Sequence, residues 1–284
     1  MTEKDAQLIK SLSDNIEDYP QGIVLPIDKP YRWTSADVIR KVKYAAIRHF
    51  GKKNLKVGHA GTLDPLATGI LLVCIGAATK RAEILQASPK EYLAGVSFGA
   101  TTPSYDLEKE IDSTFPTDGV SEESIRALLP SMLGEQDQIA PLFSAKSVDG
   151  QRVYQMARRL LKEAAAKGEA FDYAAVGDIL QANRINIYSL SLEAFESEFR
   201  QCVADDPACR IRVADVSAYK LPTATIRIGC SKGTYIRAFA RDLGEALGSG
   251  AFLSSLRRTK NGGFTIEDAI SLDTALSLLG AERG

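Results

Sequence analysis

The stretch that decides the fold reads V-G-H-A-G-T-L-D-P-L-A-T-G-I-L-L-V-C-I and occupies residues 57–75. Its three glycines permit backbone conformations that other residues resist, and Pro65 restricts φ directly after Asp64. The run Ile70–Ile75 is short, apolar and unbroken, which predicts a strand buried on both faces. We therefore expect a constrained loop that leans on the core and carries one carboxylate and the imidazole of His59.

Apolar periodicity around this stretch predicts strands and helices in an irregular order. Thr34 or Ser35 can cap a helix that Gly51 ends. The other predicted elements are strands at 22–30, 90–99, 183–192, 223–230 and 252–260, helices at 77–87, 121–132, 153–167 and 272–279, a helix through Phe239, Leu243 and Leu247, and a hairpin-like insertion at 193–215. Because regular β-α-β alternation is missing, the order favours the α+β class.

The composition is that of an ordinary globular protein, with 284 residues of which 45% are hydrophobic and 25% are charged. No apolar run approaches the roughly 20 residues of a membrane span, and the N-terminus lacks the pattern of a signal peptide. We therefore predict a cytoplasmic protein without membrane association. The four cysteines form no C-x-x-C pair, which predicts free thiols rather than a disulfide framework or a zinc site.

Positive charge is concentrated next to the central loop although the net charge is only -1. The segment from Arg40 to Lys56 holds seven basic residues and no acidic one, and Arg257, Arg258 and Lys260 form a second cluster. A solvated helix face would explain the first segment by itself. Its position directly before Gly58 favours a surface that binds RNA phosphates.

Several common catalytic motifs are missing, including the phosphate-binding loop, the dinucleotide fingerprint, H-E-x-x-H and G-x-S-x-G. His49 and His59 are the only histidines, which excludes a histidine-rich metal site, and we predict no metal. A carboxylate on a rigid loop remains. From the residues alone, Asp64 is either a turn residue with an Asx-type hydrogen bond or the centre of an active site.

Six ordered blocks decide between these interpretations. They are G-I-V-L-P-I-D-K-P with W-T-S at 22–35, G-H-A-G-T-L-D-P-L-A-T-G at 58–69, K-E-Y at 90–92, P-L-F-S-A-K-S-V-D-G-Q-R-V-Y-Q-M-A-R at 141–158, S-K-G-T-Y-I-R-A-F-A-R-D-L-G at 231–244, and L-R-R at 256–258. With these blocks the chain closely resembles the TruB family of tRNA pseudouridine synthases, over roughly residues 22–264.

The resemblance implies an α+β fold with a mixed, mainly antiparallel central sheet flanked by helices and a thumb-like insertion. It implies isomerisation of uridine 55 in the T loop of tRNA to pseudouridine on a flipped nucleotide, without a cofactor. Asp64 matches the catalytic aspartate, acting as a nucleophile or as a base. Arg237 matches the arginine that pairs with it, and Tyr92 matches the tyrosine that stacks on the uracil.

The resemblance also assigns residues to RNA binding. His59 matches the histidine that fills the space left by the flipped nucleotide, and Tyr235 and Leu256 match residues that line the nucleotide pocket. Lys29 matches a residue that either binds the substrate or chiefly supports the loop, and it is assigned to substrate binding. Lys146 and Arg158, with Arg152, are expected phosphate contacts on the thumb, so the implied partner is the T arm of tRNA. No protein partner is implied, and we expect a monomer.

The predicted domain organisation has three parts. Residues 1–21 form an N-terminal extension, 22–270 the catalytic domain with the thumb at about 141–182, and 271–284 a C-terminal helix. Many family members carry a C-terminal PUA domain, for which we expect too few residues here. Two other hypotheses remain: an RNA-binding module without chemistry, and a metal-dependent hydrolase that uses Asp64 and His59.

Overall fold

The computed structural model describes residues 12–141, 147–148, 151–152, 182–199 and 209–280. Most of the predicted thumb, including Lys146 and Arg158, lies outside these residues, as does the helix predicted at 153–167. For Arg152 only the backbone is described. The expectations for these positions therefore remain predictions from the sequence.

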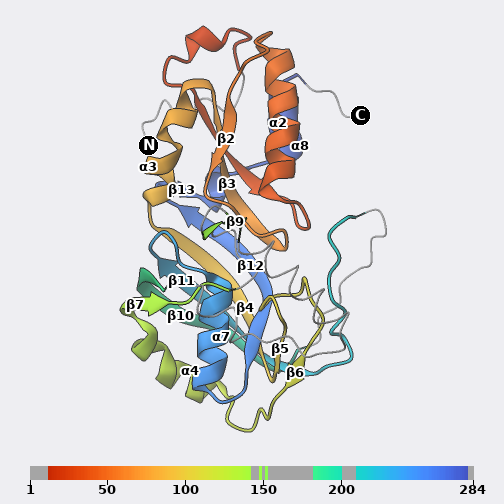
Figure 1. Cartoon of the computed structure of the whole chain (residues 1–284), viewed down its shortest axis with the longest axis vertical. Helices are drawn as coiled ribbons and strands as arrows, with labels where there is room; N and C mark the ends of the chain where they lie inside the picture. The colour runs from red at the N-terminus through yellow and green to blue at the C-terminus, as the bar shows by residue number, and fades with distance from the viewer. Residues whose placement is uncertain (1–11, 142–146, 149–150, 153–181, 200–208, 281–284) are drawn as a thin grey trace.

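One large sheet forms the framework (Figure 1). Its strands, in spatial order, are β14 (Ile270–Ser271), β1 (Ile23–Lys29), β3 (Ala67–Ile75), β12 (Ala251–Asn261), β4 (Lys90–Phe98), β11 (Leu221–Cys230), β10 (Asn183–Phe199) and β7 (Gly134–Gln138), with β2 (Val57–Ala60) paired to β3 and β13 (Phe264–Thr265) paired to β12. Two small ladders join β5 (Ala100–Thr101) to β6 (Ser113–Thr114) and β8 (Ser147–Val148) to β9 (Gln151–Arg152).

The main sheet is mixed but mainly antiparallel, which confirms the predicted α+β class. Within it, β1 runs parallel to β14 and β3 runs parallel to β12, and the other described pairs are antiparallel. The β3–β12 ladder is only three residue pairs long, from Leu256 beside Ala67 to Arg258 beside Gly69. This short ladder is the seam that joins the two antiparallel halves of the sheet.

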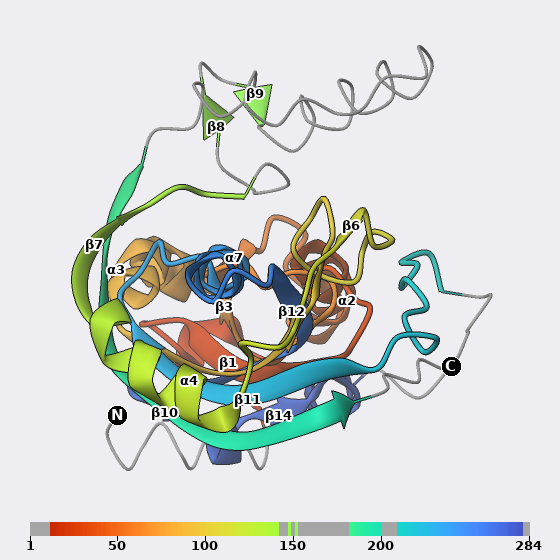
Figure 2. The same ribbon diagram turned by 90° about the horizontal axis from the view of Figure 1, so that it is seen from below.

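Helices α2, α3 and α7 lie over the concave face of the sheet (Figure 2), with α2 and α3 against β2 and α7 against β12 and β4. The helices are α2 (Ser35–His49), α3 (Ala82–Ala87), α4 (Glu122–Leu128), α7 (Ile236–Ala246) and α8 (Leu272–Leu278), with 3-10 turns η1 (Ile16–Asp18), η2 (Gly76–Arg81), η3 (Leu129–Met132) and η4 (Ile266–Asp268). The predicted cap of α2 is confirmed: Thr34 accepts from the Asp37 backbone N–H, and the Asp37 carboxylate accepts from the Thr34 backbone N–H.

The central strand also agrees with the sequence. Residues Ile70–Ile75 of β3 are all at most 1% exposed, as expected of a strand covered on both faces. Gly69 has φ +95°, and a Cβ at this position would lie 2.2 Å from the carbonyl oxygen of Arg258. Only glycine therefore lets β3 approach β12 closely enough to form the seam.

Two predictions need correction. The first part of the segment 193–215, Glu193–Phe199, is not a hairpin-like insertion, because it continues β10 and pairs with β11. Three register shifts along this strand pair interrupt the period-two alternation, which hid the strand. The helix predicted at 77–87 is split into η2 and α3.

The described cysteines agree with the expectation of free thiols. Cys74 and Cys230 are buried, Cys209 is half-buried, and each of the three is free. Burial raises the pKa of both Cys74 and Cys230 to about 11, which keeps these thiols protonated. In the part of the chain that the structure describes, no helix is long and apolar enough to span a bilayer.

Candidate active site

The loop that carries Asp64 connects β2 to β3 and is held on both sides of the carboxylate. On one side, the Ser35 hydroxyl accepts from the Leu63 N–H at 3.0 Å and donates to the Leu63 carbonyl at 3.1 Å. On the other side, the ammonium of Lys29 donates to the carbonyl of Pro65 at 3.1 Å. The position of Asp64 is therefore fixed by its neighbours in sequence.

Arg258, on β12, holds the first residues of the same loop through hydrogen bonds to their backbone carbonyls. Its guanidinium is buried, at 1% exposure, and donates to the carbonyl oxygens of Ile70 (2.7 Å), Gly61 (3.1 Å) and Thr62 (3.4 Å). A buried arginine needs several acceptors to replace its hydration, and these three carbonyls supply them. The first turn of the loop is thus tied to the seam of the sheet.

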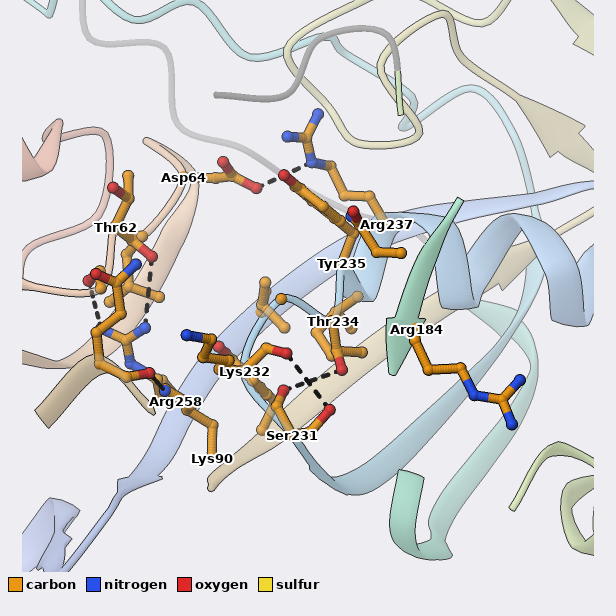
Figure 3. Close-up of a pocket in the computed structure, with 18 of the residues that line it drawn as sticks. Thr62, Asp64, Lys90, Arg184, Ser231, Lys232, Thr234, Tyr235, Arg237 and Arg258 are labelled. Atoms are coloured by element: carbon orange, nitrogen blue, oxygen red, sulfur yellow. Dashed lines mark hydrogen bonds and ion pairs between the residues drawn. The ribbon is translucent and has the colours of Figure 1, made fainter. Parts of the chain in front are cut away.

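Asp64 meets Arg237 across the cleft between the loop and α7 (Figure 3). Nε of Arg237 donates to Oδ2 of Asp64 at 2.9 Å, and one terminal nitrogen donates to the carbonyl of Ser104 at 3.1 Å. The Arg237 side chain is 5% exposed, whereas that of Asp64 is 38% exposed. A buried cation therefore orients a carboxylate that still faces solvent.

A second carboxylate, Asp106, lies on the other side of Arg237. Its Oδ2 is 3.6 Å from Nε of Arg237, and its Oδ1 accepts from the Ser104 hydroxyl at 2.6 Å and the Glu108 N–H at 3.0 Å. Burial raises the pKa of Asp106 and Arg237 offsets this only in part. Burial also disfavours the charge of Arg237, but the carboxylates of Asp64 and Asp106 outweigh it and raise the pKa of the guanidinium.

These groups border a cavity of about 680 Å³ that extends from the Asp64 loop to the start of α7. Tyr92 on β4 forms part of its wall beside Arg258, which is its register partner on β12. Burial raises the pKa of the Tyr92 phenol, so the hydroxyl stays protonated at neutral pH. The remaining wall includes Tyr235, Leu256, Lys90, Lys232 and Thr234. The cavity can take a planar, polar-edged ring next to an ionised carboxylate.

Comparison with known proteins identifies this arrangement. The model of the TruB family pseudouridylate synthase N-terminal domain matches residues 48–236, and that of the tRNA pseudouridylate synthase B C-terminal domain matches residues 237–281. The tRNA pseudouridine synthase B of Phocaeicola vulgatus is 44% identical over 90% of this chain and 93% of its own length. The chain belongs to the TruB family. It is accordingly a pseudouridine synthase, an isomerase that modifies RNA.

Further members and solved structures are consistent with this assignment. The Bacteroides thetaiotaomicron tRNA pseudouridine synthase B is 45% identical, covering 89% of this chain and 91% of that protein. The Deinococcus radiodurans protein of the same name is 37% identical, covering 88% and 77%. One chain in a crystal structure of a Cbf5–Nop10–Gar1 complex is 25% identical to this chain, with a TM-score of 0.56. The match covers 91% of this chain and 54% of that one. This chain therefore spans about half of that one and shares its pseudouridine synthase fold.

The structure brings together five of the residues that the TruB resemblance selected. Asp64, Tyr92, Tyr235, Arg237 and Leu256 all line the cavity, although they come from the β2–β3 loop, β4, α7 and its cap, and β12.

Two other selected residues lie elsewhere. Lys29 is fully buried, and its ammonium donates to the carbonyls of Pro30 (2.8 Å), Trp33 (2.6 Å) and Pro65, so it supports the loop. His59 lies on β2 and is half-buried outside the cavity wall, and its Nδ1 has no hydrogen-bond partner among the described residues. Burial and the nearby Arg258 lower the pKa of His59, so the ring is neutral at pH 7.

Three residues of the site were missed from the sequence. Asp106 sits in an acidic loop that offers no local pattern, and its role depends on Arg237, which is far away in the chain. Arg258 is expected from the sequence only as part of L-R-R and of the second basic cluster, although an arginine in a buried strand signals a cation with internal acceptors. Lys90 donates to the carbonyls of Gln86 and Ser88, and burial lowers its pKa to about 8.

The basic segment next to the loop divides into two groups. Lys43, Lys53 and Lys56 are exposed around a hollow of about 500 Å³, which also includes Gly58, and we call this group the lysine cleft. Lys52 instead pairs with Glu17 at 2.8 Å. Gly58, the last residue of the central stretch that borders this hollow, directly precedes His59 in the sequence.

The donor set gives little support for a metal centre. Over residues 12–141, 182–199 and 209–280, no group of three or more histidine, cysteine, aspartate or glutamate side chains could hold an ion. The nearby carboxylate of Asp106 does not share a metal position with Asp64, because the guanidinium of Arg237 lies between the two acids. The hydrolase hypothesis, which needs Asp64 and His59 as metal ligands, therefore lacks further ligands in the described part of the chain.

Proposed function

We propose that this enzyme converts uridine 55 in the T loop of tRNA to pseudouridine, with Asp64 as the reacting carboxylate. The observation that carries the proposal is the Asp64–Arg237 pair, in which a buried guanidinium presents a partly exposed carboxylate to a cavity that Tyr92 lines. Family membership supports pseudouridine formation in tRNA, and the names of the curated relatives support tRNA as the substrate.

Asp64 acts on the sugar of the flipped uridine. Arg237 pairs with the carboxylate and orients it in the cavity, so that Asp64 either attacks the ribose carbon or removes a ribose proton. The bond from the ribose to the uracil nitrogen breaks and the uracil rotates in place. A bond from the same ribose carbon to a uracil carbon then forms, as the aspartate leaves that carbon or returns the ribose proton. No redox change and no group donor are required.

Tyr92 holds the uracil while it rotates. Its ring forms part of the cavity wall and gives the base a face to stack on. After the new bond forms, the ring carbon loses its proton and the uracil nitrogen that left the ribose gains one. The protonated hydroxyl of Tyr92 takes part as a relay, accepting the proton from carbon while it passes its own proton on to that nitrogen or to water. Removing the uridine from its stack costs a few kcal/mol, and the neutral His59 ring occupies the vacated position in the RNA.

The T arm of tRNA supplies the remaining contacts. The lysine cleft, which includes Gly58 next to His59 in the sequence, neutralises phosphates of the T arm. The enzyme works in the cytoplasm as a monomer, with one tRNA per chain. Light scattering of the purified protein with and without tRNA tests the stoichiometry.

Mapping of pseudouridine in tRNA transcripts treated with the purified protein tests activity and position together. The proposal expects one new pseudouridine, at position 55, and its loss in Asp64→Asn with retained tRNA binding. Normal pseudouridine in the Asn variant would refute the role of Asp64, and an RNA-binding module without chemistry would form none in either protein. Activity that EDTA abolishes and a divalent ion restores would instead favour the hydrolase hypothesis.

A further inference from the structure

One polar side chain is buried in β7 although the rest of that strand is solvent-accessible. Gln138, the last residue of β7, is 3% exposed, whereas the four preceding residues are half-buried or exposed. A buried amide has to find partners for both its donor and its acceptor, or it destabilises the fold. The contacts of Gln138 should therefore show why a glutamine is placed there.

Both halves of the Gln138 amide bind the backbone of Tyr235. Its Oε1 accepts from the Tyr235 N–H at 2.8 Å, and its Nε2 donates to the Tyr235 carbonyl at 3.1 Å. Tyr235 is the N-cap residue of α7 and has no capping hydrogen bond from its own side chain. The Gln138 amide thus holds the first backbone unit of α7 in place of an ordinary cap.

This contact lies two residues before Arg237. The guanidinium end of Arg237 is fixed by Asp64, Ser104 and Asp106, so the remaining freedom of the side chain is set by where α7 begins. The preceding loop is anchored separately, because Ser231 exchanges hydrogen bonds with Asn186 on β10. Gln138 is the contact that fixes the backbone between this anchor and Arg237.

We propose that Gln138 is a positioning residue, which sets the start of α7 so that Arg237 holds Asp64 in its reactive orientation. The inference rests on the proposed roles of Asp64 and Arg237. Gln138, at the end of β7, should therefore affect the rate of the chemical step and not the affinity for RNA. A displacement of about 1 Å at a catalytic group can cost about 100-fold in rate, and the Nε–Oδ2 distance leaves little tolerance.

The test compares Gln138→Met with Thr223→Val. Methionine keeps the volume but neither donates to nor accepts from Tyr235. Thr223 shares a buried hydrogen bond of 2.8 Å with Ser97 in the same sheet, outside the cavity wall, so its valine variant controls for the loss of a buried hydrogen bond. We expect Gln138→Met to lower kcat by about 10- to 100-fold with an unchanged KM for tRNA, and Thr223→Val to leave kcat unchanged.

A second variant keeps the inference testable if Gln138→Met does not fold. In Gln138→Glu the carboxylate still accepts from the Tyr235 N–H but cannot donate to its carbonyl until it is protonated. Its kcat relative to the unmodified enzyme at the same pH should therefore rise about tenfold between pH 8 and pH 5.5, as one hydrogen bond is restored.

The outcomes separate the two proposals. A kcat within twofold of normal in Gln138→Met, or a loss that Thr223→Val reproduces, overturns the positioning role, as does a pH-independent ratio in Gln138→Glu. Asp64→Asn, measured in parallel, should be inactive. If it is active, the proposed function fails and not merely the role of Gln138.

Discussion

Replacing Arg237 by lysine should lower both the rate of pseudouridine formation and the free energy of unfolding. Arg237 serves Asp64, Ser104 and Asp106 through a planar fork, at 2.9, 3.1 and 3.6 Å. A single ammonium keeps the charge but cannot reproduce this geometry. Lysine is expected to stay with the more deeply buried Asp106, because an uncompensated buried carboxylate costs more than a partly exposed one.

The expected size of the effect follows from the lost contact with Asp64. A hydrogen bond to a charged group contributes about 1.5 to 3 kcal/mol, which corresponds to about 10- to 150-fold in kcat. The upper end applies when bound RNA excludes water from the cavity, since Asp64 is 38% exposed in the free enzyme. The lost bond to the Ser104 carbonyl should lower the free energy of unfolding by about 1 to 3 kcal/mol.

Single-turnover pseudouridine formation with excess enzyme measures the rate, and filter binding in the Asp64→Asn background measures tRNA affinity. Arg241→Lys is the matched control: Arg241 lies one turn further along α7, donates to the Ile139 carbonyl and does not contact Asp64. Its kcat should stay within about twofold. A normal kcat in Arg237→Lys, or an equal loss in both variants, would refute the reasoning from geometry.

Three further predictions concern charge, pH and backbone. Replacing all three residues of the lysine cleft by alanine should raise KM for tRNA and lower the slope of log affinity against log salt concentration by about 0.7 to 0.9 per lost phosphate contact. Lys52→Ala should change neither quantity. An unchanged slope in the triple variant would show that the cleft does not contact the RNA. Burial lowers the pKa of Lys29 from 10.5 to about 8, so the charged side chain destabilises the folded state fully below pH 8, and this penalty disappears as pH rises to 10.5. The free energy of unfolding, measured with urea, should therefore rise by up to about 3 kcal/mol from pH 8 to pH 10.5, and by less in Lys29→Met. Identical pH profiles of the two proteins would contradict this. Gly69→Ala should lower the free energy of unfolding by about 3 to 5 kcal/mol, because its Cβ meets the Arg258 backbone, while Gly58→Ala, with 4.0 Å to its nearest neighbour, should cost less than about 1 kcal/mol; similar melting temperatures would disprove the packing argument.

The elements that local sequence determines could be predicted. The cap at Thr34, the buried run Ile70–Ile75 and the alternating strand that became β4 each carry a signal within a few residues. The far part of β10 could not be predicted, because its bulges break the alternation and its charged side chains find partners on β11, as when Glu193 pairs with Arg227 at 3.2 Å. That partner is not visible from the segment itself.

The residues of the candidate site also divide into those that the sequence could predict and those that it could not. Asp64, Tyr92 and Arg237 were selected because their motifs match a family, and the structure places them around one cavity. Asp106 and Gln138 carry no motif, and their importance arises from what they contact: a buried cation in one case and a helix start in the other. Residues that act through tertiary contacts of this kind need coordinates before they can be recognised.

The separation of Asp64 and Arg237 along the chain, 173 residues, has a consequence during protein synthesis. At about 5 to 20 residues per second, the ribosome releases Asp64 roughly 9 to 35 seconds before Arg237 has been made. Throughout that interval the aspartate loop and its β3 strand lack the cation that orients the carboxylate. With the roles proposed for Asp64 and Arg237, a nascent or truncated chain that ends before α7 is expected to display the loop without modifying RNA.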